Sequence, residues 1–318
     1  ALGSLPGFYT SDDGVYQYLG ARGFLSAGDY STRFQLLLNG QRLNDNIYEQ
    51  AQFGTPFPLD MALVERIEVI SGPGSAIYGS NALFGVINVI ARDPSSMQGS
   101  TGSVGLTSRG GRELRAATST RLGQDGPNLL ASFSYADQSA QDLSIPSARG
   151  SAILADGSTS TDGIARGLGN GSVARAYVAL QDASGLRASA WALQRDVVPS
   201  MALYGTAFNS KTNSVYDASY GIAASLDRAI DSDLQFTGRV AYQEQVFSGK
   251  FVYAPAGSLS LVDTTGGWLS AESRFVYSGF TSHKLVFGAD AQRDMQLSIK
   301  NVDNASGSTV LDAHDKTW

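Results

Sequence analysis

The stretch LVERIEVISGPGSAIYGSNALFGVINVIAR, residues 63–92, has the pattern of a strand, a turn and a second strand. β-Branched Val64 and Ile67 are interleaved with charged residues, as on a half-buried strand. Glycines on both sides of Pro73 then predict a turn, because Pro fixes φ and Gly accepts backbone angles that other residues avoid. The apolar run at 86–90 predicts the second strand. We therefore expect this stretch to form the core of a small compact domain.

The glycine-rich turn also invites comparison with a phosphate-binding loop. A Walker loop needs a Lys directly after its last glycine, and the chain has no Lys before Lys211. The 23 Lys and Arg are scattered among 29 Asp and Glu, for a net charge of −6. Binding of nucleic acid needs a clustered positive face instead. We therefore expect neither a nucleotide site of this type nor a nucleic-acid partner.

The stretch resembles the plug domain of TonB-dependent outer-membrane receptors. In that family a V-E-R-I-E-V-I segment, an x-G-P turn and a Y-G-S-x-A-x-x-G-V-I-N-V-I segment follow in this order, and residues 64–90 match them almost throughout. Three upstream segments match further plug segments in the same order: Leu5–Gly7, Ala21–Phe24 and Phe34–Gly40. The resemblance implies a mixed α/β plug, residues 1–96, in the lumen of an all-β membrane barrel of 22 strands. Residues 97–318 would then carry the first strands of that barrel.

After Pro94 the chain alternates residue by residue between apolar and polar side chains, most clearly at 234–243 and 285–292. No run of 18 apolar residues exists, so a helical membrane span is excluded. Alternation over segments of about ten residues is instead the signal of a transmembrane β-barrel. A soluble β-sandwich would also alternate. We predict about nine strands, near residues 101–108, 113–122, 128–137, 171–181, 185–195, 216–226, 232–245, 266–277 and 283–294, and a tenth that starts near Lys316.

The lengths of the connections favour the barrel over the sandwich. Outer-membrane barrels have short periplasmic turns and longer extracellular loops. The predicted short connections are 123–127, 182–184, 227–231 and 278–282, and the predicted long ones are 138–170, 196–215 and 246–265. We therefore expect every long connection to lie outside the cell. An open barrel would leave unpaired backbone groups in hydrocarbon at several kcal/mol each, so we expect further strands beyond this chain, and a TonB box before it.

Two polar segments of the predicted plug, 10–17 and 44–57, are the expected ligand contacts. Both contain turn formers, and both place aromatic side chains beside hydrogen-bonding groups, as at recognition surfaces. In the resembling family the equivalent loops rise toward the outside and touch the ligand. The expected ligand-binding residues are Asp12, Tyr16, Asn44, Asn46, Tyr48 and Gln52. For each of them a solvated loop is the alternative.

The resemblance also implies contacts between plug and barrel through arginine. Arg22 keeps its family position, whereas Ser71 stands where these receptors usually carry an Arg that is thought to pair with barrel acids. We expect Arg66 to substitute, so Arg22 and Arg66 are the predicted plug–barrel contacts. This departure leaves that part of the family pattern open.

Neither a catalytic centre nor a metal site is expected from the residues. The chain has two His and no Cys, and no His lies in an H-E-x-x-H pattern. The acids at Asp12 and Asp13, and those between 137 and 162, lack EF-hand spacing, and they are either solvated or calcium ligands. No cofactor is expected.

The resemblance implies a transporter and not an enzyme. Its expected action is energy-coupled uptake of a scarce nutrient, most often a ferric siderophore, with cobalamin, haem and oligosaccharides as further options. Its expected partners are outer-membrane lipid, an inner-membrane TonB complex and a small-molecule ligand such as a metal chelate. The alternatives are a non-transporting receptor or adhesin barrel and a soluble β-rich binding protein.

Overall fold

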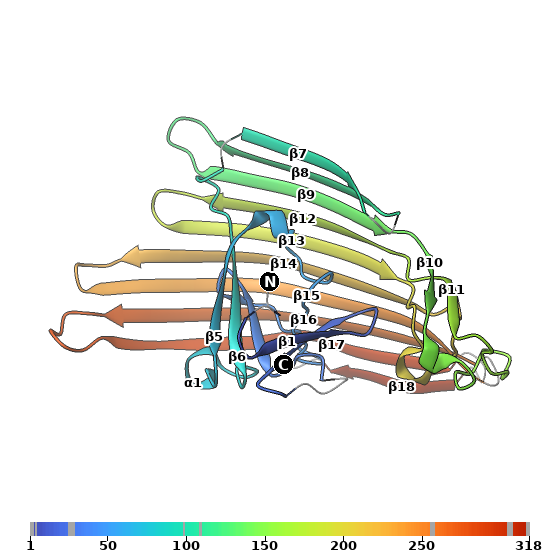
Figure 1. The fold of residues 1–318 in the computed structure, drawn as a ribbon. Coiled ribbons are helices and arrows are strands. Elements are labelled where there is room, and N and C mark those ends of the chain that lie inside the picture. The colour runs from blue at the N-terminus through green and yellow to red at the C-terminus, as the bar shows by residue number, and fades with distance from the viewer. Residues whose placement is uncertain are drawn as a thin grey trace.

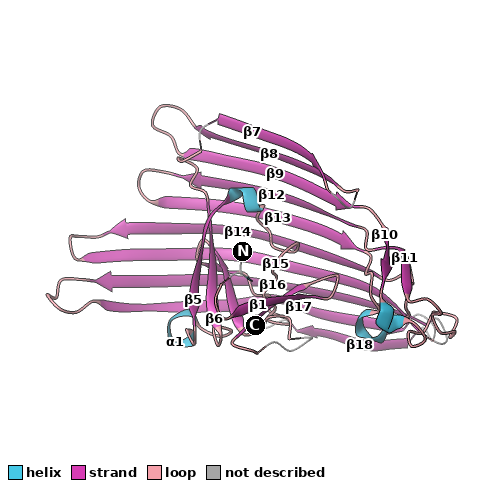
Figure 2. Ribbon diagram, in the orientation of Figure 1, coloured by secondary structure: helices cyan, strands magenta, loops and turns pink. Residues whose placement is uncertain are grey.

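The computed structural model describes residues 3, 5–24, 29–97, 99–107, 110–254, 258–303 and 308–315. A large sheet of ten strands, which we call the wall, dominates it (Figure 1). The smaller N-terminal part, which we call the plug, lies against one face of the wall (Figure 1). We call the face of the wall toward the plug inward and the other face outward. Nearly all regular structure is strand (Figure 2).

The plug is built on a four-stranded sheet with the order β4-β3-β6-β5. Its strands are β3 (Phe34–Leu38), β4 (Gln41–Arg42), β5 (Val64–Ser71) and β6 (Gly85–Ala91), and the four-residue helix α1 (Ser75–Tyr78) lies between β5 and β6. The predicted pair of strands in residues 63–92 is confirmed, because β5 and β6 pair antiparallel. Ile87 at their centre is fully buried and packs with Phe34 and Leu36 of β3. This cluster is the core of the plug.

Gly85 is required by the close approach of β5 and β6. A Cβ atom at this position would lie 2.5 Å from the carbonyl oxygen of Ile70, where no side chain can fit. The glycine of the matched G-V-I-N-V-I run therefore has a steric reason in the fold.

The first polar segment of the plug differs from the prediction. We expected residues 10–17 to be a loop, but β1 (Phe8–Asp12) and β2 (Gln17–Ala21) form an antiparallel hairpin around residues 13–16. Asp13 closes the turn, since its carboxylate accepts the backbone N–H groups of Val15 and Tyr16 at 2.9 and 2.7 Å. Only the tip of the segment is a loop, and the hairpin holds it in a defined position.

The wall is an up-and-down meander in which each strand pairs antiparallel with the next wall strand in sequence. Its strands are β7 (Gly99–Leu106), β8 (Arg112–Arg121), β9 (Asn128–Gln138), β12 (Gly171–Gln181), β13 (Leu186–Val197), β14 (Ser214–Ala229), β15 (Leu234–Tyr253), β16 (Ser258–Tyr277), β17 (Leu285–Asp303) and β18 (Ser308–Asp315). All nine predicted strands are present. The tenth was misplaced, since it begins at Ser308 and not near Lys316.

The predicted long loop at 246–265 is wrong. β15 and β16 have 20 residues each and pair without interruption from Leu234 opposite Tyr277 to Tyr253 opposite Ser258. The hairpin continues because its inward side chains Phe247 and Phe251 still have plug residues to pack against. The simple apolar pattern is lost in residues 246–265 because the side chains there pack against the plug, and the two strands continue through this region.

The two other long connections are present and are folded. Strands β10 (Gln141–Ser144) and β11 (Ile164–Leu168) form a small sheet in the first connection. Phe208 of the second connection is buried against this unit, and its backbone N–H donates to the carbonyl oxygen of Ile153 at 2.8 Å. Both connections lie at the same end of the wall, opposite the short turns (Figure 1).

No helix in the part of the chain that the structure describes is long and apolar enough to cross a membrane.

Alternation along β15 separates its two faces. Thr237 and Gln243 on the inward face are 5% and 2% exposed, whereas Val240 on the outward face is 52% exposed. Both inward residues are buried, so Thr237 and Gln243 are not the freely replaceable, water-exposed positions that alternation alone suggests. Gln235, near the end of the strand, is exposed and is the better control.

We expect Val240→Arg to harm barrel assembly far more than Gln235→Arg. A lipid-facing Arg near the bilayer midplane costs about 2–4 kcal/mol, whereas an exposed residue of the inward face already contacts water. Heat-modifiable migration of the complete protein on gels measures the assembled fraction. Equal damage by the two variants would contradict the assignment of the faces.

Candidate ligand-binding site

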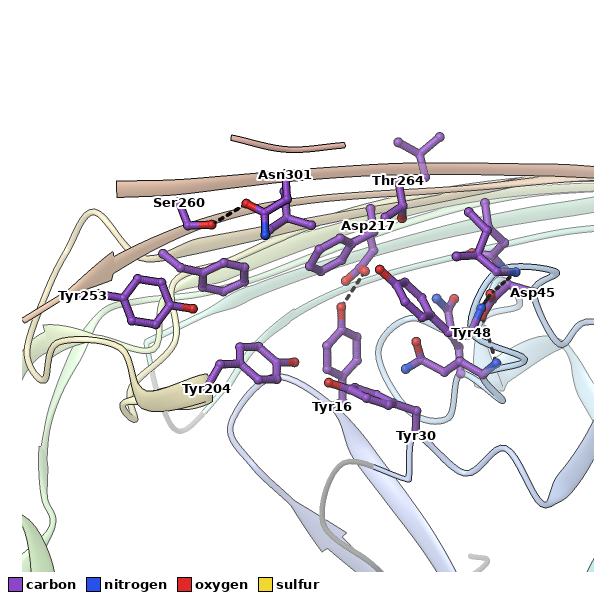
Figure 3. Close-up of a pocket in the computed structure, with 18 residues that line it drawn as sticks. Tyr16, Tyr30, Asp45, Tyr48, Tyr204, Asp217, Tyr253, Ser260, Thr264 and Asn301 are labelled. Atoms are coloured by element: carbon purple, nitrogen blue, oxygen red, sulfur yellow. Dashed lines mark hydrogen bonds between the residues drawn. The ribbon is translucent and has the colours of Figure 1, made fainter. Parts of the chain in front are cut away.

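A cavity of about 260 Å³ lies between the loops of the plug and the inward face of β14 to β17 (Figure 3). The plug contributes residues of the hairpin tip and of the segment 45–52, and the wall contributes side chains that point toward them. Aromatic rings and amide or hydroxyl groups dominate the lining, which includes Tyr16, Tyr30, Tyr48, Tyr204, Phe251 and Asn301. Such a surface can stack on the apolar faces of a ligand and hydrogen-bond its polar edges.

Three of the predicted ligand-binding residues line this cavity: Tyr16, Tyr48 and Gln52. They come from two plug segments that are far apart in sequence, and the fold brings them to one site. Tyr48 is 44% exposed and Gln52 is half-buried, so both are accessible to a ligand from the cavity. Their assignment as ligand contacts stays a prediction.

Asn44 lies in the core of the plug and not at the cavity. It is 2% exposed, and its side-chain oxygen accepts the N–H of Leu36 at 2.9 Å. Its amide nitrogen donates to the carbonyl oxygens of Phe34 and Glu49, each at 3.0 Å. Two of these bonds tie the segment after β4 to β3, and the third closes the segment on itself, so replacement of Asn44 would disturb the folding of the plug.

Asn46 and Asp12 also lie away from the lining. The amide nitrogen of Asn46 donates to the carboxylate of Asp294 at 3.0 Å and lies 3.4 Å from the carbonyl oxygen of Gly267, so this side chain joins plug and wall. Asp12 is exposed and accepts the backbone N–H of Gly14 at 2.6 Å within the hairpin tip. Turn composition singled out these residues, but composition does not show which way a side chain points.

Sequence reasoning missed the aromatic residues that complete the cavity, chiefly Tyr30, Tyr204 and Phe251. Both Tyr30 and Tyr204 have left-handed backbones, with φ of 49° and 53°. Non-glycine residues in this region are strained, and such strain is concentrated at binding and catalytic sites. The ring of Tyr204 meets that of Phe251 edge-on at 5.4 Å between centroids. The sequence could have indicated Phe251, because every second residue of β15 faces inward, and this alternation places Phe251 on the same face as Gln243.

Tyr16 connects the cavity to a buried ion pair in the wall. Its hydroxyl donates to Asp217 of β14 at 2.8 Å (Figure 3). Asp217 also pairs with Arg195 of β13 at 2.8 Å, and the two side chains are 2% and 3% exposed. Arg195 in turn donates to the carbonyl oxygen of Val15 and lies 5.2 Å from the centre of the Tyr16 ring. One cluster thus binds the hairpin tip through both backbone and side chain.

Burial decides the protonation of Tyr16. Loss of solvent raises the pKa of its hydroxyl well above the ordinary range, and the nearby charge of Asp217 raises the pKa further. The hydroxyl therefore keeps its proton and donates a hydrogen bond to Asp217. Burial likewise raises the pKa of Asp45 in the plug, although three backbone N–H bonds act in the opposite direction.

Arginines of the wall make many of the contacts between wall and plug. Among the described residues five of them reach plug oxygens: Arg115 to Asp60, Arg175 to the carbonyls of Thr55 and Phe57, Arg187 to Asp93, Arg195 to Val15 and Arg239 to Gly40. Gly40 lies in the left-handed region, with φ of 80°, and the Arg239 guanidinium packs over it, 2.6 Å from where a Cβ would lie. These arginines lie on four strands, β8, β12, β13 and β15, so the contacts extend across much of the wall.

Arg22 and Arg66, by contrast, are arginines of the plug, and they were predicted to reach the wall. Arg66 lies on β5 and pairs with Glu65 at 2.7 Å and Glu68 at 2.9 Å, both on the same strand. The guanidinium of Arg22 lies beside Gly72 of the plug. Their assignment as plug–barrel contacts stays a prediction, and the described contacts are made by wall arginines instead. Within the described residues no group of three His, Cys, Asp or Glu side chains is placed to hold a metal ion.

We expect Tyr16→Phe to loosen the hairpin tip. A hydrogen bond to a buried carboxylate contributes about 1–2 kcal/mol, so local opening should become about five- to thirtyfold more frequent. Amide hydrogen exchange of residues 13–19 in the complete protein measures this opening. Tyr135→Phe, which removes the same hydroxyl from the exposed side of β9, is the control. Unchanged exchange in Tyr16→Phe would show that the hydroxyl does not hold the tip.

We expect the contact between Asp60 and Arg115 to weaken only in acid. Burial alone would raise the pKa of Asp60, but the backbone N–H of Ala62 and the Arg115 guanidinium hold that pKa below its ordinary value of 3.8. A lowered pKa stabilises the docked plug above pH 3.8, and this stabilisation is lost as the pH falls through the lower, folded value. The difference between the parent and Asp60→Asn in the urea midpoint of plug release should therefore be constant from neutral pH to about pH 5.

Below pH 4 that difference should shrink toward zero. Asp125→Asn, in the exposed turn between β8 and β9, removes the same charge away from the plug and is the matched control. A difference that grows in acid would have the wrong sign for a lowered pKa.

Comparison with known proteins agrees with this geometry. Residues 1–86 match the family model described as TonB-dependent Receptor Plug Domain. The vitamin B12 transporter of Vibrio vulnificus (strain CMCP6) is 37% identical over 105 residues, which are 33% of this chain and 16% of that protein. The vitamin B12 transporter of Vibrio cholerae O1 (strain 395) is 32% identical over 123 residues, which are 37% of this chain and 20% of that protein.

Solved structures match over almost the whole chain. The ferric yersiniabactin uptake receptor of Yersinia pestis has a TM-score of 0.67 at 17% identity and covers 95% of this chain and 46% of its own. The pyoverdine outer-membrane receptor of Pseudomonas aeruginosa PAO1 has a TM-score of 0.66 at 16% identity and covers 94% of this chain and 44% of its own. The chain thus spans less than half the length of these structures, whose likeness is one of fold. Residues 1–86 are thus a TonB-dependent receptor plug domain, and the partial barrel sheet that follows has the fold of the outer-membrane receptors that it matches.

Proposed function

We propose that this chain is part of a TonB-dependent transporter that takes up a scarce small molecule through the outer membrane. The observation that carries the proposal is the cavity between plug and wall, where plug residues meet side chains of four wall strands. A ligand held there contacts both the plug and the barrel. Binding can therefore change the contacts on which the position of the plug depends.

The proposed division is a plug at residues 1–96 and barrel strands from residue 97. The proposed energy source is an inner-membrane TonB complex, which would move or partly unfold the plug after the ligand is bound. The proposed partners at the other faces are outer-membrane lipid and the ligand. In this scheme the protein makes no covalent change to its ligand and is not an enzyme.

The proposed cargo is a ferric siderophore or a cobalamin. Relatives in sequence are named vitamin B12 transporters, whereas the matched structures include receptors for ferric yersiniabactin and pyoverdine. The sequence match covers only a third of this chain, and the structural match is one of fold. Haem and oligosaccharides are less directly supported, because neither is named among these relatives.

We expect Tyr48→Ala and Gln52→Ala to weaken ligand binding without loss of the folded plug. Loss of one good contact costs about 1–2 kcal/mol, or about a five- to thirtyfold weaker affinity. Uptake of labelled ferric siderophores and cobalamins by cells with and without the complete gene identifies the cargo. Calorimetry with that cargo then measures the affinity of each variant.

Ser95→Ala is the control, since Ser95 lies in the connection between plug and wall and not at the cavity. The proposal fails if cells with the gene take up nothing that cells without it do not. If both variants bind the cargo as tightly as the parent, the plug residues are not part of the binding site and the loops of the wall form the binding surface. Asn44→Ala is unsuited to this test because Asn44 supports the core of the plug.

A further inference from the structure

We propose that this cavity selects a ligand without net charge: a neutral chelate or another electroneutral molecule, and not a polyanionic chelate. This inference rests on the proposed uptake function and concerns the same cavity. It follows from the charges that line the cavity, from their partners, and from the direction in which the nearby lysines and arginines point.

The lining as described holds no Lys, Arg or His, and its two ionisable acids are Asp45 and Asp217. Asp45 is 5% exposed and is committed to the plug backbone. One carboxylate oxygen accepts the N–H groups of Ile47 and Tyr48 at 2.9 and 2.6 Å, and the other accepts that of Gln50 at 3.0 Å. Its hydrogen-bonding capacity is used to shape the loop that carries Tyr48.

Asp217 is neutralised by its own partner. Arg195 pairs with it at 2.8 Å from behind the lining, and the Tyr16 hydroxyl donates to its other oxygen at 2.8 Å. The ion pair is almost fully buried, so neither charge is available to a ligand without breaking a contact of the plug. The two members cancel, and the cavity gains no net positive charge from Arg195.

Positive side chains close to the lining in sequence point to the other face of the wall. Lys250 stands one position before Phe251 on β15, and Lys300 stands one position before Asn301 on β17. Successive residues of a strand face opposite sides of the sheet, and both lysines are exposed. The described inward arginines that reach the plug are occupied by plug oxygens. A ligand anion would therefore enter without a counter-charge.

Aromatic faces and amide groups remain for recognition. Tyr48, Tyr204 and Phe251 offer rings, and Gln52 and Asn301 offer amides. Rings and amides pair well with apolar faces, carbonyls and hydroxyls of a neutral ligand. Transfer of a triply charged anion into such a site is costly, because no cation compensates the lost hydration.

Binding by the complete receptor in detergent tests the inference with three probes. Two are neutral, a ferric tris-hydroxamate and cyanocobalamin, and one is a ferric tris-catecholate with three negative charges. We expect the parent to bind one of the neutral probes at least a hundredfold more tightly than the tris-catecholate. Gln245→Lys and, independently, Ser260→Lys add a cation to the lining and should narrow that ratio at least tenfold. Ser232→Lys, in the exposed turn between β14 and β15, adds the same charge elsewhere and should leave the ratio unchanged.

Heat-modifiable migration shows which lysine variants are folded, and the parental ratio by itself already decides the inference. Tight binding of the tris-catecholate by the parent overturns it. If cells with the gene also take up that anion, the transport function stands and only the charge selection falls. If the folded receptor binds none of the probes and supports uptake of none, the proposed function and the inference fail together.

Discussion

The fold depends on the arginines that project from the wall into the plug. A sheet that closes around a lumen has a polar inward face, and its long cations need oxygen partners once water is displaced. Here Arg175 and Arg239 find backbone carbonyls, and Arg115 finds the carboxylate of Asp60. Bonds to backbone carbonyls need no particular plug side chain. The plug is thus held at many points, each of modest strength, on four strands of the wall.

This arrangement also explains the character of the cavity. The inward arginines that reach the plug are hydrogen-bonded to its oxygens, and the inward aromatic residues Phe247 and Phe251 of β15 line the cavity. Tyr16 belongs to both regions, because its ring lines the cavity and its hydroxyl meets the buried pair of Asp217 and Arg195. In the proposed site, ligand contact and plug retention therefore share one side chain. A displacement of the Tyr16 ring directly changes its hydrogen bond to Asp217 of the ion pair.

The two long connections are held by packing and hydrogen bonds, and one of them contributes Tyr204 to the cavity. Phe208 is buried against Ala148, Ala165 and Leu168 of the first connection. Asn213 anchors the second connection to the end of β15, since its side chain accepts the N–H of Val252 at 2.8 Å and donates to Ala207 at 3.1 Å. The second connection therefore presents Tyr204 to the cavity from a fixed base, and its left-handed backbone is maintained by this packing.

The sequence by itself determined the strand pair at 63–92, the alternation of the wall and the presence of nine of its strands, because these depend on local periodicity and on turn residues. It also singled out Tyr16, Tyr48 and Gln52, which line the cavity, and their role as ligand contacts stays a prediction. Only the tertiary structure decided that Asn44 is buried, that β15 and β16 continue through residues 246–265, and that wall arginines hold the plug. Each of these depends on which surfaces pack together in the fold, and local pattern carries no information about which surfaces will meet.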